Sequence, residues 1–167
     1  MTVIRPPREA DLPALTELRN DRPTQYALLA DPHPNTEADV REWLERRTSD
    51  PAALFWVVAG EHDAAVGLAQ VVAIDARSRH GMFGIAIAAR HRGQGHGRAA
   101  MLQVLVAARA DGRLDKLVLH VASDNAVACE LYRSLGFRDV GVHRHHYLAP
   151  NGWHDVAVME RFLKHGP

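Results

Sequence analysis

The stretch Arg92-Gly93-Gln94-Gly95-His96-Gly97 decides the fold of this 167-residue chain. It follows an apolar run at residues 83–89 and precedes a helix-forming run at residues 98–110, so the order is strand, glycine loop, helix. Glycines at alternate positions allow backbone conformations that other residues avoid, and they leave the amide N–H groups accessible to a ligand. The first turn of the helix adds free N–H groups and the positive end of its dipole. The loop therefore predicts a binding site for pyrophosphate.

Spacing distinguishes three kinds of phosphate loop that share this general pattern. The P-loop of nucleoside triphosphatases ends in Gly-Lys-Ser/Thr, whereas this loop ends in Gly97-Arg98-Ala99. The dinucleotide fingerprint is Gly-x-Gly-x-x-Gly, whereas the spacing here is Gly-x-Gly-x-Gly. The pattern Arg-x-x-Gly-x-Gly, formed by Arg92, Gly95 and Gly97, resembles the coenzyme A loop of the GCN5-related N-acetyltransferase (GNAT) family. A glycine-rich turn without a ligand is the alternative.

A second motif lies in the next expected helix. Asn125 and Tyr132 are seven residues apart, or two helical turns, so both are expected on one face of that helix. The segment Asn125-x-x-Ala128-x-x-Leu131-Tyr132-x-x-x-Gly136-Phe137 is similar to the second signature segment of the same family. Two motifs in the expected order are more specific than one.

The resemblance extends over residues 5–163, although the N-terminal third matches the family only in its pattern of elements. Trp43, the strand end at residues 74–77 and the closing segment at residues 141–159 are similar to polyamine and ribosomal-protein acetyltransferases. The resemblance therefore favours that branch of the family.

Hydrophobic periodicity predicts one α/β domain over residues 1–167, a single N-acetyltransferase (GNAT) domain by resemblance. Three extended segments in succession favour an antiparallel meander, and the strand-helix-strand passage at the loop favours one parallel pair. The helix after the loop is apolar almost all round and is expected to be largely buried. We expect a mixed, mostly antiparallel sheet of about six to seven strands flanked by four helices. Expected strands lie at residues 3–5, 54–59, 66–74, 80–88, 116–121, 140–148 and 153–162; expected helices begin near Asp11 and at Asn35 or Thr36, and span residues 98–110 and 125–135.

Composition excludes several classes of protein. Lys plus Arg and Asp plus Glu both number 20, so the formal net charge is zero and nucleic acid is not an expected partner. The single cysteine, Cys129, excludes an internal disulfide framework. Residues 1–11 lack the apolar segment of a signal peptide, and no run approaches membrane-spanning length. We expect a cytoplasmic protein with no membrane partner.

The resemblance implies acetyl-CoA as co-substrate, no metal, and a defined set of site residues. In the family the loop amides hold the pyrophosphate, here with Arg92 and Arg98 as supporting charges. The strand before the loop pairs with the pantetheine and polarises the thioester carbonyl. Tyr132 matches the tyrosine that supplies an acid to the departing thiolate; the alternative is a core aromatic with a satisfied hydroxyl. The expected coenzyme-binding residues are Ile85, Ala86, Ile87, Arg92, Gly93, Gln94, Gly95, His96, Gly97, Arg98, Asn125 and Tyr132, and the expected catalytic residue is Tyr132.

The general base stays open at this stage. An alkyl ammonium with a pKa of about 10.4 must lose a proton before the amine can attack a thioester. Many relatives carry a glutamate on the strand before the loop, but the aligned residue here is Met82, which cannot accept a proton. A water chain is one alternative. Imidazole titrates near neutrality, so the candidates by residue type are His80, His120, His143, His145 and His146.

Two other sets of residues have the chemistry of a functional site. His143, His145 and His146 with Asp155 resemble a metal-binding set, but regular alternation along a strand would place His145 and His146 on opposite faces. Cys129 shares the expected helix face of Tyr132 and has the chemistry of an acetyl-carrying nucleophile, but no histidine lies one turn away to activate it.

The sequence thus indicates an acyltransferase that moves the acetyl group of acetyl-CoA to a primary amine of a small molecule or peptide by direct attack on the thioester. The alternative is a CoA-binding regulatory or interaction module on the same fold. Met82 favours this alternative, because it stands where many relatives carry a glutamate.

The acceptor site is expected between the first two helices, the loop at residues 30–35 and the final hairpin. A polyamine would need clustered carboxylates, whereas the acidic residues there alternate with arginines. The acidic residues at the expected acceptor site are Asp31, Glu37 and Asp39. A homodimer is expected by family analogy only.

Overall fold

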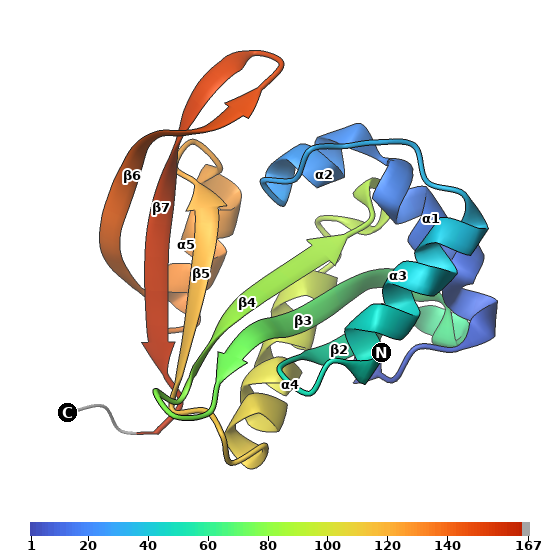
Figure 1. Ribbon diagram of the computed structural model, residues 1–167, viewed down its shortest axis with the longest axis horizontal. Helices are drawn as coiled ribbons and strands as arrows, with labels where there is room; N and C mark the ends of the chain where they lie inside the picture. The colour runs from blue at the N-terminus through green and yellow to red at the C-terminus, as the bar shows by residue number, and fades with distance from the viewer. Residues whose placement is uncertain (165–167) are drawn as a thin grey trace.

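A seven-stranded mixed β-sheet organises the computed structural model, which describes residues 1–164 (Figure 1). The strand order is β1-β2-β3-β4-β5-β7-β6, and β4 with β5 forms the parallel pair among otherwise antiparallel neighbours. This confirms the mostly antiparallel mixed sheet predicted from the sequence. The strands are β1 (Val3–Arg5), β2 (Leu54–Ala59), β3 (Ala65–Asp75), β4 (His80–Ile87), β5 (Lys116–Ala122), β6 (Arg138–Ala149) and β7 (Gly152–Phe162).

Helices pack on both faces of the sheet and form two separate cores (Figure 1). On one face, Leu12 and Leu15 of α1 (Leu12–Asn20) pack with Val40 of α3 (Glu37–Ser49). On the other face, α4 (His96–Ala110) and α5 (Ala126–Ser134) pack with Leu117 and Leu119 of β5. We call these the α1–α3 face and the α4–α5 face. Among the residues described, no helix is long and apolar enough to cross a membrane.

The strands β4 and β5 separate towards their C-terminal ends. Their parallel pairing runs from His80↔Lys116 to Met82↔Val118, but β4 continues to Ile87 and β5 to Ala122. Figure 1 shows the two strands diverging beyond the paired part. Beyond Met82 and Val118, the backbones of β4 and β5 therefore do not pair with each other. This opening lies at the C-terminal ends of the strands, where open α/β sheets bind ligands.

Two elements differ from the sequence prediction. A short helix, α2 (Arg22–Ala27), was not expected; Asp21 caps it by accepting the Thr24 N–H at 3.2 Å. The prediction that α4 is largely buried is wrong for one side of the helix, where Leu102 is 48% and Val106 is 70% exposed. The sheet covers only one side of a helix, so the apolar residues on the opposite side stay in solvent.

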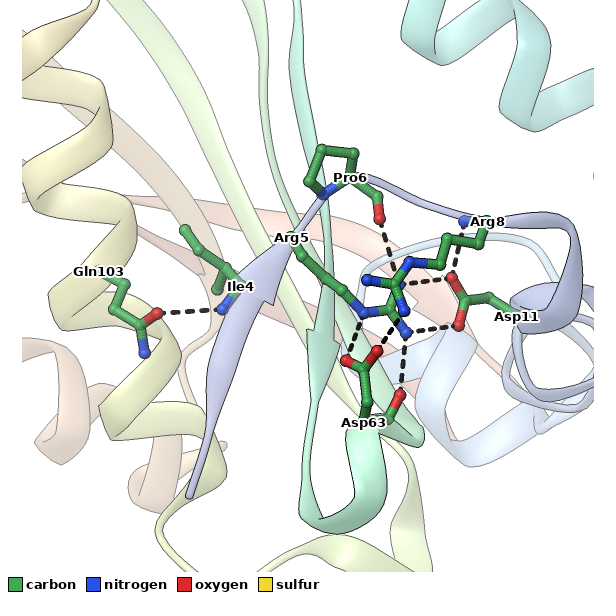
Figure 2. Close-up of polar contacts among 7 residues, drawn as sticks. All are labelled: Ile4, Arg5, Pro6, Arg8, Asp11, Asp63 and Gln103. Carbon is green, nitrogen blue, oxygen red and sulfur yellow. Dashed lines mark hydrogen bonds and ion pairs between the residues drawn. The ribbon is translucent and has the colours of Figure 1, made fainter.

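The edge strand β1 is held by polar contacts on both sides (Figure 2). The Arg5 guanidinium donates to both carboxylate oxygens of Asp11, at 2.7 and 2.8 Å, and to Asp63 at 2.7 Å. The Ile4 N–H donates to the side-chain oxygen of Gln103 at 3.0 Å. The one polar residue within the apolar run of α4 thus ties this helix to β1.

The strand β6 contains a bulge that interrupts its alternation. His143 pairs with Val156 and Tyr147 pairs with His154, so residues 144–146 stand opposite Asp155. The Asp155 carboxylate accepts the backbone N–H of His145 at 2.9 Å and pairs with Arg144 at 2.6 Å. His145 takes a φ of 46°, in the left-handed region that costs most residues free energy. The carboxylate of Asp155 stabilises this conformation.

Candidate active site

The glycine loop forms the turn between β4 and α4, as the sequence predicted. Gly93 and Gly95 have φ values of 73° and 83°, which favour glycine, and Gly95 is the N-cap of α4. A Cβ built on either residue meets no atom within 4 Å, so open space borders the loop. Gly97 lies in the first turn of α4 and does not use a positive φ. Two of the three glycines therefore have the positive φ that favours glycine over other residues.

Arg92 links the loop to the strand before it and to α2. Its Nε donates to the carbonyl of Ile87 at 2.9 Å, and another guanidinium nitrogen donates to the hydroxyl of Thr24. Thr24 is buried and comes from the helix that was missing from the sequence prediction. The guanidinium of Arg92 is thus committed to protein oxygens, and it positions the loop against α2.

His96 and Arg98 also contact neighbouring elements. The His96 ring hydrogen-bonds with the hydroxyl of Thr2 at 2.8 Å, and Arg98 donates to the hydroxyl of Ser134 at 2.8 Å. These side chains tie the start of α4 to the N-terminus and to α5. The first-turn N–H groups of α4, which have no acceptor within the helix, are the donors that the loop offers to an anion.

The free edge of β4 runs directly into this loop. Ile85 and Ile87 pack towards the α4–α5 face, whereas Ala86 lies in the core of the α1–α3 face. All three pair with β3 on one side, while the β4–β5 pairing ends at Met82. An extended ligand can therefore add its own hydrogen bonds to the open side of this strand.

The second motif lies on α5 and the residue before it. Asn125 caps the helix by accepting the Ala128 N–H at 3.2 Å. Tyr132 is 9% exposed and packs beside Phe137, with ring centroids 5.9 Å apart, in the core of the α4–α5 face. Burial, with a smaller effect of Cys129, raises the pKa of Tyr132 to about 12. The phenol is a proton or hydrogen-bond donor throughout the physiological pH range.

Cys129 shows none of the features of an activated nucleophile. The residue is 4% exposed, and burial raises the pKa of its thiol. The sulfur lies 3.9 Å from the carbonyl oxygen of Ala122. A buried thiol with a raised pKa is a poor nucleophile at neutral pH, which argues against an acetyl-cysteine intermediate.

The histidines that were candidates by residue type fall into distinct places. His143 and His146 stack with ring centroids 4.6 Å apart, and the ring of His120 lies 5.7 Å from His143 and 6.5 Å from His146. The bulge brings His143 and His146 together, so the alternation expected along this strand does not apply. His80 lies at the start of β4, and His145 is part of the bulge. Within residues 1–164, no group of three or more His, Cys, Asp or Glu side chains has the arrangement of a metal site.

Two further polar groups border this region and were not found from the sequence. The Tyr147 hydroxyl donates to the Ala30 carbonyl at 2.8 Å, so the β6–β7 hairpin contacts the loop after α2. Gln70 pairs with Gly84 across β3 and β4, and its side-chain oxygen is buried without a partner in the described part of the chain. No local sequence signal marks either residue, because both depend on long-range packing.

Comparisons with known proteins agree on one family. A family model described as an acetyltransferase (GNAT) domain matches residues 2–138. Spermidine N(1)-acetyltransferase of Vibrio cholerae serotype O1 is 26% identical over 156 residues, which cover 93% of this chain and 90% of that protein. The [ribosomal protein bS18]-alanine N-acetyltransferase of Escherichia coli strain K12 is 34% identical over 96 residues, or 58% of this chain and 62% of that protein.

A solved structure matches nearly the whole chain. The crystal structure of spermidine N-acetyltransferase from Vibrio cholerae in complex with CoA and spermine has a TM-score of 0.90 and 25% sequence identity. The match covers 97% of this chain and 95% of that one. This chain therefore shares its overall fold with a solved N-acetyltransferase.

Proposed function

The chain belongs to the GNAT acetyltransferase family, and from this premise we propose that it moves the acetyl group of acetyl-CoA to a primary amine, which attacks the thioester directly. One observation carries this proposal: the glycine loop at the N-terminus of α4 continues from the free edge of β4. An anion site beside an open strand edge suits a ligand with a pyrophosphate and an extended amide-bearing arm. Acetyl-CoA has both parts.

We propose a role for each part of this site. The first-turn N–H groups of α4, from Gly95 onwards, bind the pyrophosphate, and the residues Ile85 to Ile87 hold the pantetheine and polarise the thioester carbonyl. Arg92 and Arg98 act mainly by positioning the loop, because both are bonded to protein oxygens. Tyr132 donates a hydrogen bond to the departing sulfur.

The acceptor is proposed to bind on the α1–α3 face, between α2, the loop after it and the β6–β7 hairpin. The bond from Tyr147 to Ala30 supports this site, because it brings the hairpin to that loop. Two of the three acidic residues singled out for a polyamine have other partners: Asp39 bonds with Thr36 at the start of α3, and Glu37 lies 3.7 Å from Arg41. These pairings leave fewer free carboxylates for a polycation, so a single primary amine is the acceptor feature that we propose.

A panel of amines tests the proposed function. Release of free CoA thiol from acetyl-CoA is followed with spermidine, spermine, amino acids and a peptide with an N-terminal alanine, and products are identified by their mass. We expect steady turnover with at least one primary amine and none with its tertiary analogue. Tight CoA binding by calorimetry without thiol release for any amine would instead support a CoA-binding module.

Two properties of the whole chain are part of the proposal. Residues 1–167 form one GNAT domain, which is supported by a single sheet whose strands run from Val3 to Phe162. The chain forms a homodimer, which is supported by the exposed edge strand β6 with Val140 and Val142 in solvent. Light scattering across a range of concentrations tests the second point.

A further inference from the structure

Three imidazoles gather on one side of the sheet, on strands that are not adjacent. His120 comes from β5, and His143 and His146 come from β6, while β7 lies between these strands. The ring centroids are 4.6 to 6.5 Å apart. We call these three residues the histidine cluster.

The bulge in β6 creates this cluster. In a regular strand, His143 and His146 would project from opposite faces, because they are an odd number of residues apart. The extra residues opposite Asp155 bring His146 back to the face of His143. His120 pairs with Val158 of β7, and His143 pairs with Val156, two residues along that strand, so the two histidines share one face of the sheet across β7. The strained backbone of His145 is thus retained at a place where it assembles three titratable groups.

The cluster lies beside the diverging ends of β4 and β5. Leu119 and Val121 point into the core of the α4–α5 face, so His120 between them projects towards the α1–α3 face. His120 lies two residues beyond Val118, the last residue of β5 that pairs with β4, so it stands where the two strands have separated. Tyr132 lies on the other face. A thioester between the two strand ends would therefore have His120 on one side and the phenol on the other.

The charged residues on the same face of the sheet as His120 have partners of their own. Lys116 and Glu160, on the same face of β5 and β7, are paired with each other at 2.8 Å. His154 of β7 hydrogen-bonds with Asp124 at 2.9 Å, and β4 contributes Met82 and Gly84 to this face. His120 is exposed, and its partial desolvation first, and then the imidazoles of His143 and His146, lower its pKa. The lowered pKa favours the neutral imidazole, which is the form that can accept a proton.

We propose that His120 is the general base of the proposed acetyl transfer, and that His143 and His146 position its imidazole. The proposal rests on the proposed function of this site. The acceptor leaves one ammonium proton in solvent, and its nitrogen lone pair forms the C–N bond to the thioester carbonyl carbon. His120 takes the second proton as this bond forms, because the nitrogen becomes far more acidic than the free ammonium. The C–S bond breaks with its electron pair on sulfur, and the imidazolium proton passes to that sulfur. The products are the amide and free CoA thiol, and His120 is neutral again.

The variant His120→Asn tests this role, with His62→Asn in the exposed turn before β3 as the matched control. We expect kcat/KM at pH 7 for the best amine of the panel to fall by roughly a hundred- to ten-thousandfold in His120→Asn. The acidic limb of the pH profile should disappear as well, while the Kd for CoA stays within about twofold by calorimetry. The control should keep the wild-type rate and profile. A His120→Asn enzyme with wild-type kcat/KM and an unchanged pH profile overturns the proposal.

A second variant separates a base from a merely structural residue. His146→Ala removes one of the imidazoles that lower the pKa of His120, so the acidic limb of the kcat/KM profile should move to higher pH. The same upward shift should be seen in the NMR titration of His120, which needs no acceptor. If neither the acidic limb of the kcat/KM profile nor the NMR titration of His120 moves in His146→Ala, His146 does not have the proposed positioning role. Failure of the wild-type protein to acetylate any amine would overturn the proposed function itself, and this outcome is distinct from an active wild type with an unaffected His120→Asn.

Discussion

The pKa of Tyr132 limits what its hydroxyl can do. A phenol with a pKa of about 12 is protonated at neutral pH, but full transfer of its proton to a thiolate with an ordinary pKa of about 8.5 is uphill. Donating a hydrogen bond to the sulfur as negative charge develops costs no such transfer and strengthens in the transition state. The proton that converts the sulfur to the CoA thiol then comes from the acceptor nitrogen, which loses protons as the amide forms.

The change Tyr132→Phe removes this donor and leaves the ring. Because the hydrogen bond is made mainly in the transition state, we expect kcat to fall by roughly ten- to a thousandfold while the Kd for acetyl-CoA is nearly constant. Thiol release and calorimetry measure the two quantities. Unchanged turnover of Tyr132→Phe with every active amine would show that the hydroxyl has only a packing role.

Two glycine-to-alanine variants distinguish exclusion of the ligand at the loop from strain in the backbone. Gly95 and Gly112, at the two ends of α4, have φ values of 83° and 79°, and a Cβ on either meets nothing within 4 Å. Alanine at either position therefore carries a similar conformational cost, of about 1 kcal/mol. We expect Gly95→Ala to weaken CoA binding at least tenfold, because its Cβ projects beside the proposed pyrophosphate site, and Gly112→Ala to leave the affinity unchanged. Equal CoA affinities of the two variants, measured by calorimetry, would place the pyrophosphate elsewhere.

The contact of the β6–β7 hairpin with the loop after α2 should affect the acceptor more than the coenzyme. Tyr147→Phe removes the bond to Ala30, worth about 1 kcal/mol, and loosens one wall of the proposed acceptor site. We expect a several-fold higher KM for the amine with an unchanged Kd for CoA. Thr48→Val is the control, because its hydroxyl bonds to Leu44 within α3. An unaltered amine KM in Tyr147→Phe argues against an acceptor site at this contact.

The sequence predicts elements well where one local rule governs them. The glycine loop between β4 and α4, the start of α5 near Asn125 and the final hairpin of β6 and β7 each follow local sequence signals, and each is found where it was expected. The bulge of β6 is not predicted, because it depends on the carboxylate of Asp155 from the neighbouring strand. The burial of α4 is overestimated, because hydrophobicity alone does not show how much of a helix the sheet covers.

At the scale of the molecule, the proposed coenzyme half of the site is more predictable than the proposed acceptor half. The loop and β4 are adjacent in sequence, so their geometry follows from one strand-loop-helix unit. The proposed acceptor half joins α2, the loop after it, β5 and β6, which meet only through the topology of the whole sheet. Residue type alone identified His120 as one of five candidates, and only the folded arrangement distinguishes it from the others.

The Arg5–Asp11–Asp63 network makes the stability of the whole molecule depend on pH. Burial raises the pKa of the Asp11 carboxyl, but the hydrogen bonds and charges of Arg5 and Arg8 outweigh this effect, and the pKa of Asp11 is lowered in the folded state. A lowered pKa means that the ionised carboxylate stabilises the fold above the unfolded pKa of about 3.9, and that this contribution is lost as the pH falls through the folded pKa.

Asp11→Asn should therefore destabilise the protein strongly at pH 7 and less at pH 3, which lies below the unfolded pKa of about 3.9. The change leaves Arg5, whose side chain is 10% exposed, with only Asp63 as an ionic partner, and removal of one member of a buried pair costs about 3 kcal/mol. Asp139→Asn is the control: its pair with Arg133 is about half exposed on both sides, so a loss below about 1 kcal/mol is expected. Urea unfolding of both variants and the wild type at the two pH values measures these differences. A pH-independent loss in Asp11→Asn, or a loss no larger than in Asp139→Asn, would show that the ionised pair does not anchor the edge strand β1.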